Sequence, residues 1–262
     1  MERQTNLVFQ PQIAKNKPET IRHADNVCPF CDYENLSDIL AHEDDRIWLV
    51  NKYRTLKDTW QTIIIETHQH DGDIANYSQS QNRQIINFAL QKWQAVMASQ
   101  KYQSVLLYKN FGPLSGGSLS HPHMQIVGLD KIDIHDNVSI NNVLGMSIWQ
   151  QESLVVNIST QPIIGFVEIN VLLTNSKAQT TLADIIQIVV RYLLNDYLGG
   201  RCDSYNLFFY EFNQQVAVKI VPRFVTSPYF VGYKIPQIND HQQMLQIKQA
   251  LQKLISKQLL NS

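Results

Sequence analysis

The segment SLSHPHMQIVG, residues 118–128, places His121 and His123 one residue apart, with Gln125 following at the same spacing. Successive side chains of a β-strand point to opposite faces, so these three polar residues would share one face, while the alternate positions are apolar and suit a core. Proline is confined to strand starts and edges, so Pro122 predicts that a strand begins here, beside a loop. Buried polar groups need partners or a ligand. The two imidazoles are therefore either hydrogen-bonded core residues or a site of metal or nucleophilic chemistry.

The loop before this strand, NFGPLSGGSLS (residues 110–120), is rich in small residues and neutral hydrogen-bond donors. Its glycines permit close approach of a ligand to the backbone, and such a turn can form a nest for phosphate oxygens. It is not a P-loop, because no Gly-Lys-Ser/Thr follows. A plain surface turn is the alternative, and the neighbouring histidines favour the phosphate site. The residues that could contribute are Asn110, Gly112, Ser115, Gly116, Gly117, Ser118 and Ser120.

Cys28-Pro-Phe-Cys31 has the spacing with which two thiolates bind one tetrahedral Zn²⁺. No second Cys-x-x-Cys follows, so two further ligands would come from distant positions, and His68, His70 and His121 are available near predicted strand ends. A thioredoxin-like redox pair is one alternative, although no βαβ unit surrounds the two cysteines. Two ordinary thiols in a turn are the other.

Hydrophobic periodicity predicts the order strand, strand, helix, strand, strand twice, with an offset of roughly 100 residues. The two helices are predicted at 78–100 and 181–198. We infer a duplicated α+β unit, in which helices pack on a mainly antiparallel sheet. The strands are predicted at 45–53, 59–68, 104–111 and 123–129, and again at 153–160, 165–174, 204–212 and 216–223.

These elements divide the chain into an N-terminal arm (residues 1–25), a first half (26–150) and a second half (151–262). The arm shows no periodicity, as is typical of a terminus. A last helix at 241–260 carries a Leu/Ile stripe, which predicts that it packs across the sheet.

The composition limits the class of protein. The chain has 262 residues, 17% of them charged, and a net charge of −1, which does not favour binding to a long nucleic acid. No apolar run is long enough to span a membrane, and the polar N-terminus lacks the core of a signal peptide, so we expect a cytoplasmic protein. Three cysteines, an odd number, argue against a disulfide framework.

The combination of Cys-x-x-Cys, a later histidine, the Gly/Ser loop and His-Pro-His-x-Gln resembles the galactose-1-phosphate uridylyltransferase family, a branch of the histidine-triad superfamily. The motifs cover about residues 26–128, and the second half agrees in element order. The resemblance implies two histidine-triad-like units, the first catalytic and the second degenerate. It also implies a nucleotidyltransferase that passes a nucleoside monophosphate group between phosphorylated substrates through a covalent nucleotidyl-histidine.

The resemblance assigns roles to the residues that match its motifs. His123 matches the nucleophile, Gln125 the glutamine that hydrogen-bonds the α-phosphate, and Asn51 in WLVNKY a ribose contact. Asn110 and Ser118 match phosphate contacts, and the loop adds Ser115, Gly116 and Gly117 as candidate substrate-binding residues. Cys28, Cys31, His70 and His121 match the ligands of a structural zinc ion. His70 is preferred to His68 because ETHQHDGDI aligns His70 and Ile74 with the family's histidine and leucine.

Two features bear on the reaction. Glutamine cannot protonate a leaving group, whereas hydrolases of the superfamily have a histidine at this position, so Gln125 favours transfer or phosphorolysis over hydrolysis. The stretch QVAVKIVPR has Ala217 and Lys219 where the family has histidines, which departs from galactose 1-phosphate binding. The expected partner is a nucleotide sugar or another nucleotide, and the resemblance suggests a homodimer. The alternatives are a dinucleoside polyphosphate or ADP-sugar phosphorylase or hydrolase, and a catalytically inactive zinc-containing nucleotide-binding protein.

Overall fold

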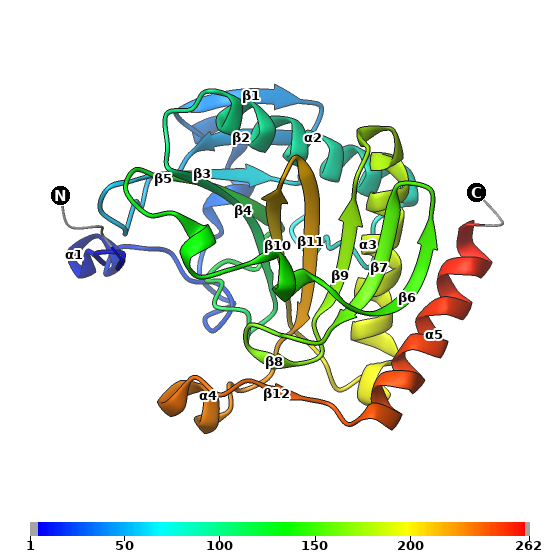
Figure 1. The fold of residues 1–262 in the computed structure, drawn as a ribbon. Coiled ribbons are helices and arrows are strands. Elements are labelled where there is room, and N and C mark those ends of the chain that lie inside the picture. The colour runs from blue at the N-terminus through cyan, green and yellow to red at the C-terminus, as the bar shows by residue number, and fades with distance from the viewer. Residues whose placement is uncertain (1–4, 260–262) are drawn as a thin grey trace. The chain divides into compact units, whose positions relative to one another are not determined.

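Each of the two units of the chain contains five antiparallel strands and a long helix (Figure 1). The computed structural model describes residues 5–259 and divides into two units. The first unit contains the residues up to Asp73 together with Gln84–Asn137, and the second contains Ile74–Arg83 together with the residues from Val138 onward. The predicted α+β class is confirmed. Residues 1–4 of the predicted arm and Leu260 of the last predicted helix lie outside the described residues.

The sheet of the first unit has the strand order β1-β2-β3-β5-β4, with every neighbouring pair antiparallel. Helix α2 (Gln79–Ala98) buries the apolar stripe that the sequence predicts, including Ile86 and Trp93. The short elements of this unit are α1 (Pro11–Ala14), η1 (Pro29–Cys31), η2 (Tyr33–Asn35) and η3 (Ile134–Asp136). The strands are β1 (Ile39–Glu43), β2 (Arg46–Val50), β3 (Thr59–Ile65), β4 (Ser104–Phe111) and β5 (His123–Leu129).

The second unit repeats this plan with the order β6-β7-β9-β11-β10. Helix α3 (Gln179–Asn195) packs on β9 and β11, while α5 (His241–Leu259) packs on α3 and on the edge strand β6, and so reaches only the edge of the sheet. The strands are β6 (Gly145–Gln151), β7 (Leu154–Ser159), β9 (Ile169–Leu173), β10 (Tyr205–Phe212) and β11 (Gln215–Pro222). The remaining elements are β8 (Gly165–Phe166), β12 (Gln237–Ile238), α4 (Pro228–Tyr233), η4 (Ile140–Val143), η5 (Ser176–Ala178) and η6 (Tyr197–Gly199).

The two units correspond strand for strand, and one backbone hydrogen bond fixes their register. The amide of Asn51 donates to the carbonyl of Gln61 at 2.9 Å, and in the second unit the amide of Ser159 donates to the carbonyl of Glu168 at 2.8 Å. The predicted duplication is therefore confirmed. The sequence missed the edge strands β1 and β6, because much of each is solvent-exposed and carries no regular apolar alternation.

The sheet of the first unit has one apolar face and one mixed face. Met124 and Ile126 of β5 belong to the apolar face and are fully buried. On the mixed face, Gln125 pairs across the strands with Ile63 of β3 and Tyr108 of β4. The alternation predicted from the sequence thus brings the polar residues of β5 onto the face that carries the candidate site.

Candidate active site and metal centre

Four potential metal ligands lie together at the start of β5. The ligand atoms of Cys28, Cys31, His70 and His121 are all within 4.8 Å of one another. The Cys31 Sγ atom is 3.2 Å from Nδ1 of His70 and 3.5 Å from Nδ1 of His121. These residues come from η1, the segment after β3 and the entry to β5, so the site joins parts of the chain that are distant in sequence. Two thiolates and two imidazoles form a donor set that suits tetrahedral Zn²⁺.

The surroundings of His121 suit a metal-bound histidine. Its Nε2–H donates to the carbonyl of Thr67 at 2.9 Å, which leaves Nδ1 toward Cys31 as the ligand atom. Metal-bound histidines usually donate their second ring N–H in this way. Burial also raises the pKa of the Cys28 thiol to about 11, so without a cation the thiol stays protonated. A metal ion would favour the thiolate. The ring of His68, the other candidate histidine, instead lies against that of Tyr33, with centroids 3.9 Å apart and the ring planes tilted by 42°.

His123 begins β5 and lies beside this cluster. Its Nδ1–H donates to the carbonyl of His121 at 2.8 Å, and its ring meets Phe30 edge-on at a centroid distance of 5.4 Å. Burial, with only 7% of the residue exposed, lowers the pKa of His123 to about 4. At neutral pH the ring is therefore uncharged, with Nε2 as its unprotonated nitrogen.

Gln125 follows on the same face and is oriented by Tyr108. The Tyr108 hydroxyl donates to Oε1 of Gln125 at 3.0 Å. Because this bond engages the amide oxygen, the amide nitrogen is left as a donor toward a ligand. Burial raises the pKa of Tyr108 to about 12, so its hydroxyl remains a donor throughout the physiological range.

The N-terminal arm holds the Gly/Ser loop in place. The amide of Thr20 donates to the carbonyl of Ser118 at 2.8 Å, and the Thr20 hydroxyl accepts from the amide of Ser120 at 2.9 Å. Within the loop, Ser115 donates its hydroxyl to the carbonyl of Gly112 at 2.8 Å. Gly116 has φ +85°, a backbone conformation that favours glycine.

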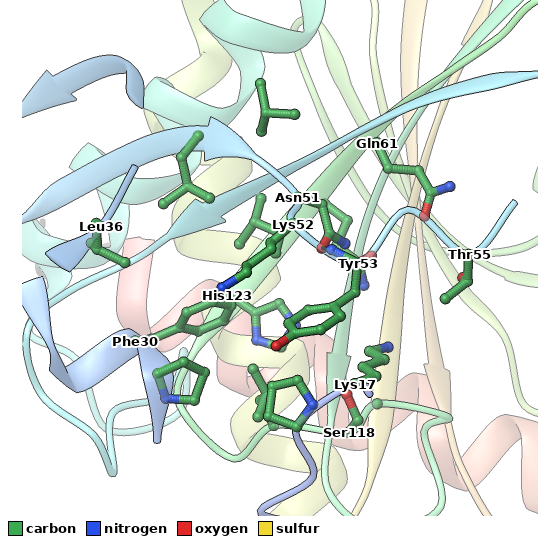
Figure 2. Close-up of a pocket in the computed structure, with 18 of the residues that line it drawn as sticks. Lys17, Phe30, Leu36, Asn51, Lys52, Tyr53, Thr55, Gln61, Ser118 and His123 are labelled. Carbon is green, nitrogen blue, oxygen red and sulfur yellow. Dashed lines mark hydrogen bonds between the residues drawn. The ribbon is translucent and has the colours of Figure 1, made fainter. Parts of the chain in front are cut away.

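His123, Gln125 and part of the Gly/Ser loop line a cavity of about 390 Å³ (Figure 2). Among the predicted substrate-binding residues, Ser115 does not line it, because its hydroxyl is used inside the loop. Asn51 accepts a hydrogen bond from the amide of Tyr53 at 2.8 Å, which leaves its side-chain amide nitrogen as a donor. The predicted residues that do line the cavity are Asn51, Asn110, Gly116, Gly117, Ser118, His123 and Gln125.

The cavity also includes residues that sequence reasoning did not single out. Lys17, from the arm, lines the wall near Ser118, and desolvation by the surrounding protein lowers its pKa. Lys52 and Tyr53 follow Asn51 at the end of β2, and Asp32 follows Cys31 in the metal-binding segment. Asp32, Lys52 and Tyr53 are neighbours in sequence of residues that the motifs did identify. Nothing in the sequence pattern of the arm indicates Lys17.

Beneath the site is a fully buried ion pair. Lys109 of β4 donates to Glu66 at 2.6 Å and lies 3.7 Å from a carboxylate oxygen of Asp73. A buried charge must be paired to be tolerated, so this pair is part of the framework on which the segment between β3 and α2 rests.

Two solved structures of low sequence identity have a similar fold. A uridylyltransferase structure matches with a TM-score of 0.68 and 15% identity, over 87% of this chain and 92% of that chain. An ADP-glucose phosphorylase from Arabidopsis thaliana, with ADP-glucose bound, matches with a TM-score of 0.67 and 12% identity, over 97% of each chain. The fold is thus shared with the uridylyltransferase and with a GalT-like protein from Arabidopsis thaliana, as the motifs predict.

The family itself follows from two further matches. The model for the N-terminal domain of DUF4931, described as a domain of unknown function, matches residues 9–132, and that for its C-terminal domain matches residues 135–254. The crystal structure of a DUF4931 family protein from Bacillus cereus ATCC 10987 is 45% identical, with a TM-score of 0.75, over 83% of this chain and 99% of that chain. The chain belongs to the DUF4931 family. None of the curated proteins compared with it matches.

Among the described residues, no helix is both long enough and apolar enough to cross a bilayer.

Proposed function

We propose that this protein is a nucleotidyltransferase in which His123 takes a nucleoside monophosphate group from a nucleotide sugar or another nucleotide and passes it to a second phosphorylated molecule. The observation that carries the proposal is the 2.8 Å hydrogen bond from Nδ1–H of His123 to the carbonyl of His121. It fixes the tautomer in which Nε2 has the lone pair, inside a cavity that suits a nucleotide.

The groups around His123 fit the phosphates. Gln125 offers an amide nitrogen, the Gly/Ser loop offers the backbone amide of Gly116, and Lys17 supplies positive charge. Fixed donors that face developing negative charge are worth about 10²–10³ in rate each. These residues would therefore hold the α-phosphate next to Nε2 and stabilise the transferring group.

The opposite end of the cavity fits a nucleoside. Phe30, Leu49 and Ile63 are buried hydrophobic residues that line it, and a planar base has two apolar faces. Asn51 lines the same cavity beside Lys52 and Tyr53, and its amide nitrogen would contact the ribose.

The proposed step balances without an external acid. The Nε2 lone pair forms a P–N bond to the α-phosphorus while the P–O bond to the leaving group breaks, and the leaving group departs as a phosphate ester. A phosphate oxygen of the acceptor then attacks the same phosphorus, the P–N bond breaks, and the neutral imidazole is restored. A phosphate leaving group needs little protonation, which is compatible with glutamine at position 125.

Cys28, Cys31, His70 and His121 would hold a zinc ion with four protein ligands. Such a closed site supplies structure and not an activated water, so its role would be to fix the entry to β5. His121 then has two tasks: its ring contributes to the metal site, while its carbonyl orients His123.

Covalent labelling tests the proposal. The full-length chain is incubated separately with α-phosphate-labelled UDP-glucose, ADP-glucose, GDP-mannose and diadenosine tetraphosphate, and then probed for label that is acid-labile and base-stable. We expect such label with at least one donor, its discharge by a phosphorylated acceptor, and its absence in His123→Ala. His241→Ala, at the exposed start of α5, is the matched control and should label normally.

Two results would refute the proposal. One is the absence of label with every donor in a zinc-loaded, folded protein, which would favour a catalytically inactive nucleotide-binding protein. The other is turnover in which water accepts the nucleotidyl group faster than any phosphate acceptor.

A further inference from the structure

We propose that the base recognised by this cavity is guanine, and that Asp32 reads it with the help of Asn35 and Lys52. The inference rests on the proposed function only in placing the α-phosphate at His123. It concerns the identity of the nucleotide, which neither the fold nor the family determines.

The position of the base follows from the two ends of the cavity. In Figure 2, Phe30 and Leu36 lie on one side of His123, whereas Thr55 and Gln61 lie on the other. The Phe30 side has apolar walls that suit the faces of a base, and Ser118 and Lys17 suit phosphates. A nucleotide whose α-phosphate is at His123 therefore places its base at the end that η1 and η2 enclose.

The rim of this end presents hydrogen-bond acceptors. Asp32 lies between η1 and η2, Asn35 ends η2, and both line the cavity. Nδ2 of Asn35 donates to both carboxylate oxygens of Asp32, at 2.9 and 3.0 Å. This contact uses the amide donor and fixes the carboxylate, so the pair offers the remaining carboxylate lone pairs and Oδ1 of Asn35 to a ligand.

A donor faces the same end from the other wall. Lys52 follows β2, and Figure 2 shows its ammonium group directed toward Phe30. Within residues 5–259, neither Asp32 nor Lys52 makes a salt bridge. The apolar slot is thus flanked by a carboxylate and an ammonium that do not neutralise each other.

Guanine matches this arrangement better than the other bases. Its N1–H and N2–H₂ are adjacent donors, which a carboxylate accepts side by side, and its O6 accepts from an ammonium. Uracil has a single N3–H between two carbonyl oxygens, which a carboxylate repels. Adenine and cytosine place an acceptor nitrogen beside their amino group, so a carboxylate that accepts from the amino group repels this nitrogen, and Nδ2 of Asn35 is already used by Asp32.

Binding of mononucleotides tests the inference independently of catalysis. Dissociation constants of GMP, AMP, UMP and CMP are measured by calorimetry on the zinc-loaded full-length chain, for the unmodified protein and for Asp32→Asn, Lys52→Gln and Glu34→Gln. Glu34 is the matched control, because it is an exposed carboxylate in η2 that does not line the cavity. We expect GMP to bind at least about tenfold more tightly than the others, since a well-placed base contact discriminates by roughly 1–3 kcal/mol.

In Asp32→Asn this preference should fall to about twofold or less, with zinc content unchanged. Lys52→Gln should weaken it in part, and Glu34→Gln should preserve it. Equal binding of the four nucleotides, a preference for AMP or UMP, or a guanine preference that survives Asp32→Asn would overturn the inference. Labelling of His123 by UDP-glucose or ADP-glucose but not by GDP-mannose would refute guanine and leave the proposed function intact. Selective GMP binding without labelling of His123 would support guanine and refute the proposed function.

Discussion

The two halves of this protein share one strand order but use the corresponding face of the sheet in opposite ways. The hydrogen bond from Asn51 to Gln61 corresponds to the one from Ser159 to Glu168 in the other half. Two residues further along each strand, Ile63 therefore corresponds to Asn170. Ile63 pairs with Gln125, and Asn170 pairs with Lys219. Lys219 therefore occupies the position of Gln125, and Ala217 that of His123.

In the second half most polar groups of this face pair within the protein, and Oδ1 of Asn170 is an exception without a hydrogen-bond partner among the described residues. Lys219 donates to Glu168 and to the carbonyl of Asn142, both at 2.7 Å, and Asn170 donates to Asn157 at 2.8 Å. The Glu168 carboxylate also accepts from the backbone amides of residues 163–165. In the first half, by contrast, Gln125 and His123 each keep a group that faces a cavity. The same framework thus supports either a closed polar network or a ligand site, depending on whether its polar groups find partners within the protein.

The largest expected effect concerns the candidate metal site of the first half. Cys31→Ser should abolish stoichiometric zinc binding and destabilise residues 26–132, because a structural zinc site can contribute on the order of 10 kcal/mol. Hydrogen exchange should show lost protection there and retained protection in β7, β9 and β11. Cys202→Ser, which changes a buried thiol away from the cluster, should keep the zinc. Uniform loss of protection in both halves would contradict an independent role of the metal.

The buried ion pair of the second half gives the next effect. Lys219→Met leaves Glu168 charged and buried, so it should lower the free energy of unfolding by about 3–5 kcal/mol in chemical denaturation. Lys219→Met combined with Glu168→Gln should recover part of this loss, because the charge is removed while the amide keeps only one of the two oxygens that accept from residues 163–165. Labelling of His123 per folded molecule should stay unchanged throughout. A labelling defect in the stable double variant would show that the second half takes part in the reaction.

Gln125→Leu should lower the rate of His123 labelling about 10²-fold, which corresponds to about 2.7 kcal/mol, because one donor to the transferring phosphate is lost. Stability should change little. The informative counterpart is Gln125→His, which supplies a group able to protonate a leaving group and should raise the share of turnover that ends in water. If Gln125→Leu labels at the normal rate, the residue does not contact the phosphate.

The smallest effect is expected for Tyr108→Phe, which removes the hydrogen bond that orients Gln125. A typical hydrogen bond contributes about 0.5–1.5 kcal/mol, so labelling should slow by about tenfold or less. In the Gln125→Leu background the same substitution should have no further effect, because the group that it orients is gone. Additive losses in the double variant would assign Tyr108 a separate role.

The sequence predicts the site residues that lie on regular elements better than those that do not. Strand alternation placed His123 and Gln125 on one face. The Cys-x-x-Cys spacing indicated a metal site, whereas His70 and His121 were assigned to it by the family resemblance. Lys17 was not predicted as a site residue, because it lies in an arm without periodicity and reaches the site only through tertiary contacts. Ser115 was included among the ligand contacts since its chemistry fits, but backbone geometry directs its hydroxyl into the loop. The edge strands β1 and β6 were not predicted, because much of each is exposed and the apolar alternation is weak.

The hydrogen bonds between Thr20 and the Gly/Ser loop join residues about a hundred positions apart, so they can form only after most of the first half has folded. Closing so long a loop carries an entropic cost that local contacts do not repay early, and such contacts tend to form late in folding. The wall that Lys17 supplies would then be among the last parts of the cavity to form and the first to open. A ligand that binds there also binds the arm. Ligand binding should therefore protect residues 15–20 from proteases, and the degree of protection should follow the affinity.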